Sequence, residues 1–181
     1  MAAFFYYPCC YTYAVGDRDA INFGFQYERL LDPRRYNPNG YGMSFGTDYR
    51  WKDLHLLSVN IDMSSLSTAS GIDPSGYVFI GKFHTEYGLS YFLPHGKLGA
   101  QLKAGPGAIF LRDGSKGENR KTPGLGLMGG FAFVWRPFYV SKNGYNSFVI
   151  SLRADLWRYF FIQPFLGKTS LTIGPLFGVE F

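Results

Sequence analysis

The chain has 181 residues and a formal net charge of +5, with 46% hydrophobic and 17% charged residues. This length favours one domain with a substantial core. Its 18 Phe, 14 Tyr and 23 Gly exceed average usage and favour strands and tight turns over a helical domain. No run of about 18 apolar residues exists, which excludes a transmembrane helix, so that only a closed barrel could carry this chain across a membrane.

The first twenty residues begin with an apolar, aromatic-rich stretch, MAAFFYYPCCYTYAV. It contains a weak small-x-small arrangement of the kind that precedes signal cleavage, but no basic segment comes first and Pro8 interrupts the apolar run. We therefore expect residues 1–20 to be a signal-peptide remnant or a flexible N-terminal arm. The only cysteines, Cys9 and Cys10, are adjacent and lack the spacing of a metal site or a disulfide framework.

Eight segments from residue 21 onward alternate apolar and polar residues with the two-residue period of a strand that has one apolar face. They span residues 21–31, 40–52, 55–64, 76–93, 97–112, 124–136, 146–160 and 169–181. This pattern predicts an all-β fold, an eight-stranded antiparallel up-and-down β-barrel over residues 21–181. Pro106 and Pro175 lie inside segments and cannot donate a ladder hydrogen bond, so we expect bulges there.

The connections and the aromatic residues favour a transmembrane barrel over a soluble eight-stranded barrel of lipocalin type. Connections after odd-numbered segments are polar and rich in turn formers, whereas residues 52–54 and 94–96 form tight turns and residues 137–146 a longer one. Aromatic residues of the apolar parity gather near both segment ends, as at membrane interfaces. One rim would carry Trp51, Tyr91, Trp135 and Phe181, and the other Tyr27, Tyr41, Tyr77 and Phe110.

The opposite parity would face the lumen, and its charged residues are nearly balanced in sign. The candidate ion-pair network comprises Glu28, Asp48, Arg50, Asp62, Lys82, His84, Glu86, Lys103, Arg136, Arg153, Asp155 and Glu180. Such a set can pair within itself and fill the narrow interior of an eight-stranded barrel, which predicts a plugged lumen rather than an open pore.

Lys82, His84 and Glu86 share one strand face and could also form a proton relay, although a structural network is the favoured interpretation. No Ser or Cys pairs obviously with a histidine and an acid, and metal clusters, phosphate-binding glycine loops and nucleotide motifs are absent from the sequence. We therefore expect no catalytic residues, no metal and no cofactor.

Basic residues outside the lumen concentrate at the predicted outer loops and strand ends. They are Arg34, Arg35, Arg112, Lys116, Arg120, Lys121 and Lys168. There they could pair with the phosphates of lipopolysaccharide or another anionic surface, or simply keep the loops soluble. Their dispersal along the chain argues against a nucleic-acid partner.

The segment LTIGPLFGVEF, residues 171–181, alternates strictly and stops on an aromatic residue. It resembles the closing strand that the outer-membrane insertion machinery of Gram-negative bacteria recognises. The stretch KLGAQLKAGPGAIFL resembles the glycine-studded fifth strand of many small barrels. Together with the eight segments and the loop lengths, these features make residues 21–181 resemble small outer-membrane barrels of the OmpA transmembrane, OmpX and opacity-protein type.

This resemblance implies an integral outer-membrane location, lipid and possible lipopolysaccharide contacts, and a non-enzymatic structural, adhesive or surface-contact role. Two alternatives stay open. A small-solute, porin-like channel would need a continuous water path past the lumen charges. A lipid A-modifying enzyme resembling the deacylases would need their lipid-facing His-x-Ser pair, whereas His84 has the lumen parity and precedes Glu86 by two residues.

Overall fold

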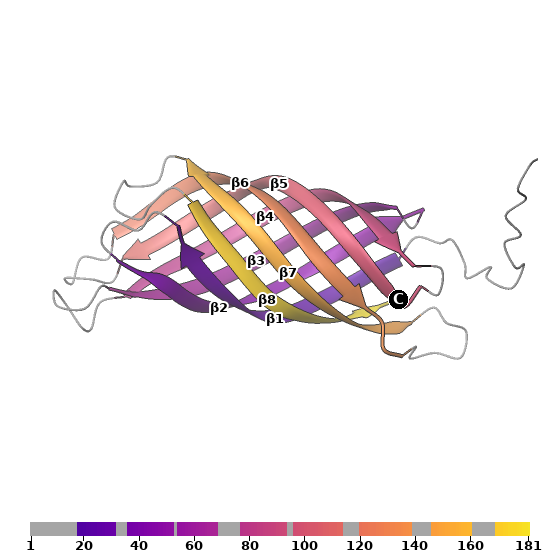
Figure 1. Cartoon of the computed structure of the whole chain (residues 1–181). Coiled ribbons are helices and arrows are strands. Elements are labelled where there is room, and N and C mark those ends of the chain that lie inside the picture. The colour runs from indigo at the N-terminus through magenta and orange to yellow at the C-terminus, as the bar shows by residue number, and fades with distance from the viewer. Residues whose placement is uncertain are drawn as a thin grey trace, which may run out of the picture.

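The computed structural model describes residues 18–31, 36–52, 54–68, 77–93, 96–113, 120–138, 146–160 and 169–181. In this part of the chain, eight antiparallel strands form a closed barrel in sequence order, and β8 pairs with β1 (Figure 1). The strands are β1 (Arg18–Leu30), β2 (Tyr36–Trp51), β3 (His55–Thr68), β4 (Tyr77–Phe92), β5 (Leu98–Asp113), β6 (Arg120–Trp135), β7 (Ser147–Phe160) and β8 (Thr169–Glu180). The predicted all-β, eight-stranded barrel is confirmed.

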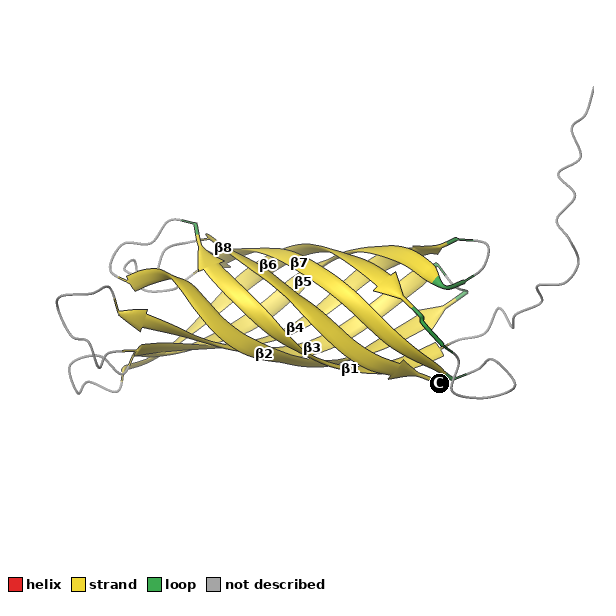
Figure 2. Ribbon diagram, turned by 60° about the horizontal axis from the view of Figure 1, so that its bottom comes forward, coloured by secondary structure: helices red, strands yellow, loops and turns green. Residues whose placement is uncertain are grey.

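All eight strands tilt against the barrel axis (Figure 2). We call the rim where β2, β4, β6 and β8 finish the turn end, and the opposite rim the loop end; the chain's last residue marks the turn end in Figure 1. Within the residues that the structure describes, there is no helix long and apolar enough to cross a bilayer.

Four strand boundaries differ by three or four residues from those expected from sequence, and one of them is the start of β6, at Arg120 instead of residue 124. β1 begins at Arg18 because Arg18 and Asp19 already pair with Arg50 and Tyr49 of β2. β2 begins at Tyr36 and β3 continues to Thr68, where polar residues on both faces weaken the alternation. The expectation for a leader or arm concerns mainly residues 1–17, which lie outside the described part of the chain.

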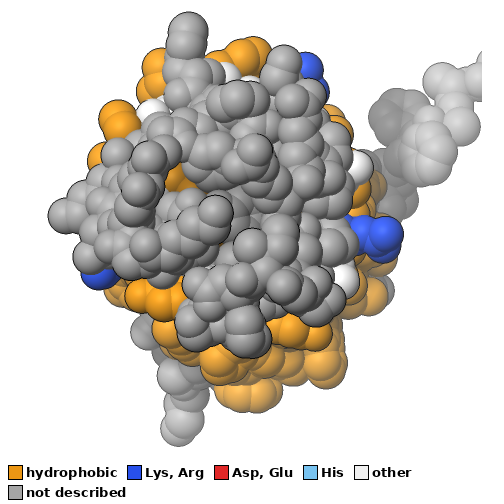
Figure 3. All heavy atoms as spheres, turned by 90° about the vertical axis from the view of Figure 1, so that its left-hand side faces the viewer, with side chains coloured by type: hydrophobic (Ala, Val, Ile, Leu, Met, Phe, Trp, Pro, Cys, Tyr) orange, Lys and Arg blue, Asp and Glu red, His pale blue; other side chains and the backbone are white. Residues whose placement is uncertain are grey.

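The two faces of the wall have opposite chemistry. Outward positions carry large apolar side chains that are roughly half exposed, such as Phe25, Phe45 and Leu127, whereas the intervening positions point inward and are buried. Figure 3, viewed from the loop end, shows hydrophobic side chains around the outer surface of the barrel, with lysine or arginine side chains at its margin. An apolar outer belt around a polar interior reverses the arrangement of a water-soluble protein and suits a lipid surrounding.

The prediction of bulges at Pro106 and Pro175 is wrong. Pairing between β4 and β5 has the same register on either side of Pro106, and pairing between β1 and β8 has the same register on either side of Pro175. Only the ladder contact itself is interrupted there, since proline has no N–H to donate. The register shift that does occur in the described strands lies in β2, between Tyr36 and Gly40.

Each of these prolines follows a glycine that lets the strands stay close. A Cβ on Gly105 would collide with the carbonyl oxygen of Thr85, and one on Gly174 with that of Phe25. By register, these are the two carbonyls that face Pro106 and Pro175. The two backbones thus approach closely at the positions where proline supplies no N–H, and the register passes both without a bulge.

Candidate functional site

The lumen is filled in layers that follow the sequence of β4. From the turn end upward, Ser90 and Gly88 are followed by the inward side chains of Glu86, His84, Lys82, Ile80 and Val78, all buried. A strand directs every second side chain to one face, so three ionisable residues lie below two aliphatic ones in a single column. Partners from the other strands complete each layer.

At the turn end, three arginines and one serine surround a single carboxylate. Arg136, directly after β6, donates from Nε and Nη2 to the two oxygens of Glu180, at 2.6 and 2.8 Å. Arg50 Nη2 of β2 lies 2.7 Å from the same carboxylate, Arg18 Nη1 of β1 lies 3.6 Å away, and Ser147 Oγ of β7 donates at 3.0 Å. We call Glu180 with Arg18, Arg50 and Arg136 the mouth cluster. It joins both strands of the β1–β8 closure to β2 and to the end of β6.

The middle layer centres on Arg153 of β7, which reaches across the lumen. Its Nη2 lies 3.3 Å from Glu86 of β4 and 3.5 Å from Asp62 of β3, and its Nε pairs with Asp155. Lys103 of β5 adds a contact of 3.3 Å to Glu86. The contacts of Arg153 with Glu86 and Asp62 bridge strands that are not neighbours in the wall, so the Arg153 side chain occupies the interior itself.

His84 lies between two acids and an aromatic ring. Its Nε2 is 3.1 Å from Asp62, its Nδ1 is 2.6 Å from Glu86, and its ring meets the ring of Trp157 edge to face at 4.9 Å. The histidine is 1% exposed. A proton relay needs access to a proton source or a substrate, and this enclosure provides neither, so the geometry suits a structural role.

Above it, Glu28 of β1 and Lys82 of β4 form a pair without solvent exposure. Their charged atoms are 2.7 Å apart, and Tyr159 and Ser170 donate to the same carboxylate oxygen at 2.8 Å each. The Lys82 ammonium also lies 5.0 Å from the Trp157 ring centre, within cation–π range. This layer links β1, β4, β7 and β8.

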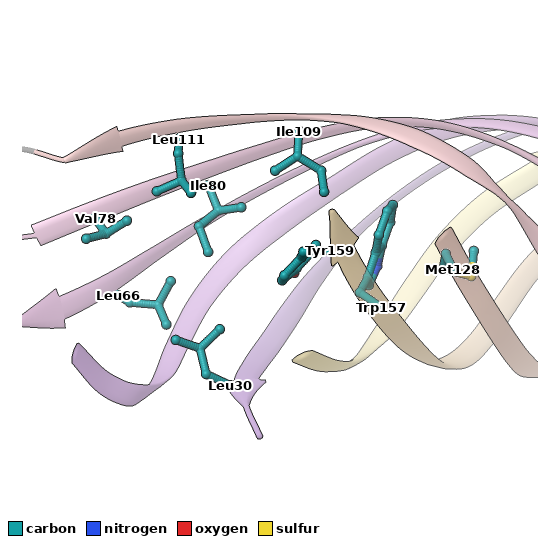
Figure 4. Close-up of a cluster of buried hydrophobic side chains, with 9 residues drawn as sticks. All are labelled: Leu30, Leu66, Val78, Ile80, Ile109, Leu111, Met128, Trp157 and Tyr159. Carbon is teal, nitrogen blue, oxygen red and sulfur yellow. The ribbon is translucent and has the colours of Figure 1, made fainter. Parts of the chain in front are cut away.

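The loop end of the lumen is closed by an apolar cluster that sequence analysis missed. Its members all point inward (Figure 4): Leu30, Leu66, Val78, Ile80, Ile109, Leu111, Met128, Trp157 and Tyr159. The signal was present, because both parities of β4 are apolar from Tyr77 to Ile80. We call this group the apolar plug.

Little free volume remains between the layers. A pocket beside Arg153 and Asp155, at the β1–β8 junction, has about 10 Å³, room for roughly one water. The described residues include no group of three or more His, Cys, Asp or Glu side chains able to hold a metal ion. In the part of the chain that the structure describes, these layers hold paired charges away from solvent.

The remaining site residues occupy the two rims. Asp48 lies inward on β2, where it accepts from Asn22 at 2.9 Å and lies 3.8 Å from Lys103. On the outer face, Trp51, Tyr91, Trp135 and Phe181 lie at the turn end, and Tyr27, Tyr41, Tyr77 and Phe110 lie toward the loop end. Trp51 stacks on His55 at 5.1 Å.

Most of the predicted outer-loop cations lie where the structure describes no side chain. Arg34, Arg35, Lys116 and Lys168 are outside the described residues, and Arg120 and Lys121 are described only as backbone of β6. Arg112 is exposed near the loop end of β5. The structure adds two exposed cations toward that rim that the sequence reading did not single out, Arg29 of β1 and Arg158 of β7.

No family model and no curated protein sequence matches the chain. Among solved structures, it is similar to Ail, the attachment invasion locus protein of Yersinia pestis, with a TM-score of 0.62, 13% identity and coverage of 92% of this chain and 99% of that one. The N-terminal β-barrel domain of Pseudomonas aeruginosa OprF has a TM-score of 0.54 and 13% identity, with coverage of 92% of this chain and 98% of that one. Neisserial surface protein A has a TM-score of 0.51 and 11% identity, with coverage of 91% of this chain and 96% of that one.

These similarities cover nearly the whole of each chain but rest on low sequence identity, so they concern the fold. The location predicted from sequence, integral in the outer membrane, agrees with the apolar belt and with that fold. The chain therefore has the fold of the small outer-membrane β-barrels, with buried charged residues in its lumen.

Proposed function

We propose that this barrel resides in the bacterial outer membrane as a non-conducting, non-enzymatic protein with a structural or surface-contact role at its loop end. The filled lumen carries this proposal. Ion pairs cross it in three layers, from Glu180 through Arg153 to Glu28, and the apolar plug lies above them. A conducting pore needs a continuous water path, and these layers interrupt it.

Conductance in planar bilayers tests the closed lumen. The protein, refolded in detergent and first checked by the heat-dependent gel-mobility shift of folded barrels, is added to the bilayer beside a porin as positive control. We expect no stepwise current from the protein. Reproducible steps that scale with salt concentration would contradict the closed lumen and favour a small-solute channel.

We further propose that the loop end binds anionic saccharide, with lipopolysaccharide phosphates as the partner. Arg29, Arg112 and Arg158 are exposed near that rim on β1, β5 and β7, and guanidinium groups pair well with phosphate. Ail, with which the chain shares its fold, has been crystallised with the heparin analogue sucrose octasulfate, itself a polyanion.

The test is the stabilisation of the folded barrel by added lipopolysaccharide, measured as the temperature of the gel-mobility shift. The double variant Arg29→Gln, Arg158→Gln should lose most of this stabilisation. Lys97→Gln removes an exposed charge at the turn end and should keep it. Equal stabilisation of all three proteins would contradict a lipopolysaccharide site at the loop end.

As part of the same proposal, we expect that the protein does not modify lipid A. Of the two histidines that the structure describes, His84 is enclosed in the lumen, and His55 hydrogen-bonds to Tyr87 at 2.7 Å and stacks on Trp51. Neither sits in a His-x-Ser pair. We expect the mass of lipid A to be unchanged when the protein is expressed, and a new lipid A species would overturn the non-enzymatic role.

A further inference from the structure

The mouth cluster holds more positive charge than its acid can balance. Arg18, Arg50 and Arg136 all pair with the single carboxylate of Glu180, so that among the described residues three cations share one ion-pair partner. Arg50, Arg136 and Glu180 are each less than 5% exposed. Buried charges without counter-ions are costly, so a cluster of this composition calls for further negative charge.

Unmet hydrogen-bond donors point the same way. Arg50 Nε and Nη1 and Arg18 Nη1 are buried, and none has a hydrogen-bond acceptor in the structure. Arg50 is 3% exposed, and only its Nη2 contacts Glu180. Buried donors left unpaired each cost free energy, whereas a guanidinium fork matches the oxygens of an oxyanion in two directions at once.

The surrounding side chains hold the guanidinium groups in place without neutralising them. The centre of the Phe92 ring lies 3.7 Å from the guanidinium carbon of Arg136 and 4.7 Å from that of Arg50. Both guanidinium groups therefore make cation–π contacts with the same ring. Arg136 Nη1 also donates to the Gly96 carbonyl at 2.7 Å. Two of the three cations are thereby fixed before any ligand arrives.

No other carboxylate of the described chain contacts these arginines. The nearest along β2 is Asp48, two residues and about 7 Å further up the strand, where it accepts from Asn22 and lies near Lys103. The acidic excess of the lumen lies higher still, around Arg153. From its position on β2, Asp48 attracts Arg50 electrostatically, but in the described part of the chain it forms no hydrogen bond or ion pair with the unmet donors of the mouth cluster.

We propose that the mouth cluster binds a small oxyanion of the phosphate or sulfate class, held by Arg18 and Arg50. Glu180 fixes the spacing of these two guanidinium groups and Phe92 supports Arg50 and Arg136. The ion completes the charge balance and the hydrogen bonding of the turn end. This inference is independent of what the loop end binds.

Titration with inorganic phosphate tests it, using the whole protein folded in a phosphate-free maltoside detergent at constant ionic strength. We expect one saturable site by calorimetry and a mobility-shift temperature that rises with the logarithm of phosphate concentration, while chloride has no such effect. Arg18→Gln should weaken phosphate binding about tenfold, equivalent to about 1.4 kcal/mol. Lys97→Gln, at the same rim but outside the cluster, should bind as the unmodified chain does.

Arg50→Lys serves as a second variant, since it keeps the charge but removes the fork, and it too should weaken binding. A parallel titration with phosphatidylglycerol distinguishes the source of the oxyanion. Stabilisation by the lipid alone would assign the site to a phosphate headgroup, and stabilisation by both would assign it to the free ion. Absence of saturable binding of either probe, or equal affinity in Arg18→Gln and the unmodified chain, would overturn the proposal.

Discussion

Replacing Lys82 by methionine should destabilise the barrel strongly, because it leaves the buried carboxylate of Glu28 without a counter-ion. Lys82 and Glu28 have no exposed side-chain surface, and their charged atoms are 2.7 Å apart. Methionine keeps the length of the side chain but leaves the Glu28 carboxylate with neutral hydroxyl partners, those of Tyr159, Ser170 and Ser64. Breaking a buried pair from one side costs about 3 to 5 kcal/mol in unfolding free energy.

A double-mutant cycle separates this charge effect from lost packing. Glu28→Gln combined with Lys82→Met leaves no unpaired charge, so the double variant should be more stable than the sum of the single losses by about 2 kcal/mol. Unfolding by urea in lipid vesicles, followed by tryptophan fluorescence and gel mobility, measures each free energy. Trp157, 5.0 Å from the Lys82 ammonium, supplies a local signal.

Lys97→Met is the matched control, since Lys97 is exposed at the turn end and the change should stay within about 0.5 kcal/mol. The reasoning fails if Lys82→Met costs less than about 1 kcal/mol. It also fails if the two single losses simply add, because the pair would then contribute no coupling energy.

Two further changes probe the wall and the plug. Gly174→Ala should cost about 1 to 3 kcal/mol and lower the mobility-shift temperature, because its Cβ would collide with Phe25 O and Gln26 Cα; Gly129→Ala, which meets nothing within 4 Å, should be nearly neutral. Equal shifts for the two variants would mean that the close approach at Gly174 is not what the glycine serves. Trp157→Ala should leave a cavity in the plug and cost about 3 to 5 kcal/mol by urea unfolding; a cost below about 1 kcal/mol would show that Trp157 is not a packed core residue.

The wall could be predicted from sequence because one physical constraint controls it. Lipid on one side and a narrow interior on the other force strict alternation, so the faces of residues such as Phe23 and Asn22 follow from parity alone. The prolines were misjudged because the pattern does not show how close two backbones lie. Gly105 and Gly174 remove the need for a bulge only through that closeness.

The ion pairs inside the lumen could not be predicted from the sequence, because they depend on the stagger of the strands around the barrel. Lys82 meets Glu28 across 54 residues and Arg153 meets Glu86 across 67. Parity states that these side chains point inward, but not which of them share a level. The plug was hidden for a related reason, since the sequence does not show that Val78 and Ile80 lie beside apolar residues of other strands.

The two Gly-Pro steps divide the molecule in a way that its continuous circular wall conceals. They interrupt the ladder between β4 and β5 and between β8 and β1, which are diametrically opposite junctions of an eight-membered ring. Each half of the chain thus forms a four-stranded sheet whose own ladders lack such a break in the described residues, apart from the register shift in β2. The closed wall can therefore also be described as two four-stranded sheets, β1 to β4 and β5 to β8, which meet at the two positions where proline leaves a ladder contact unmade.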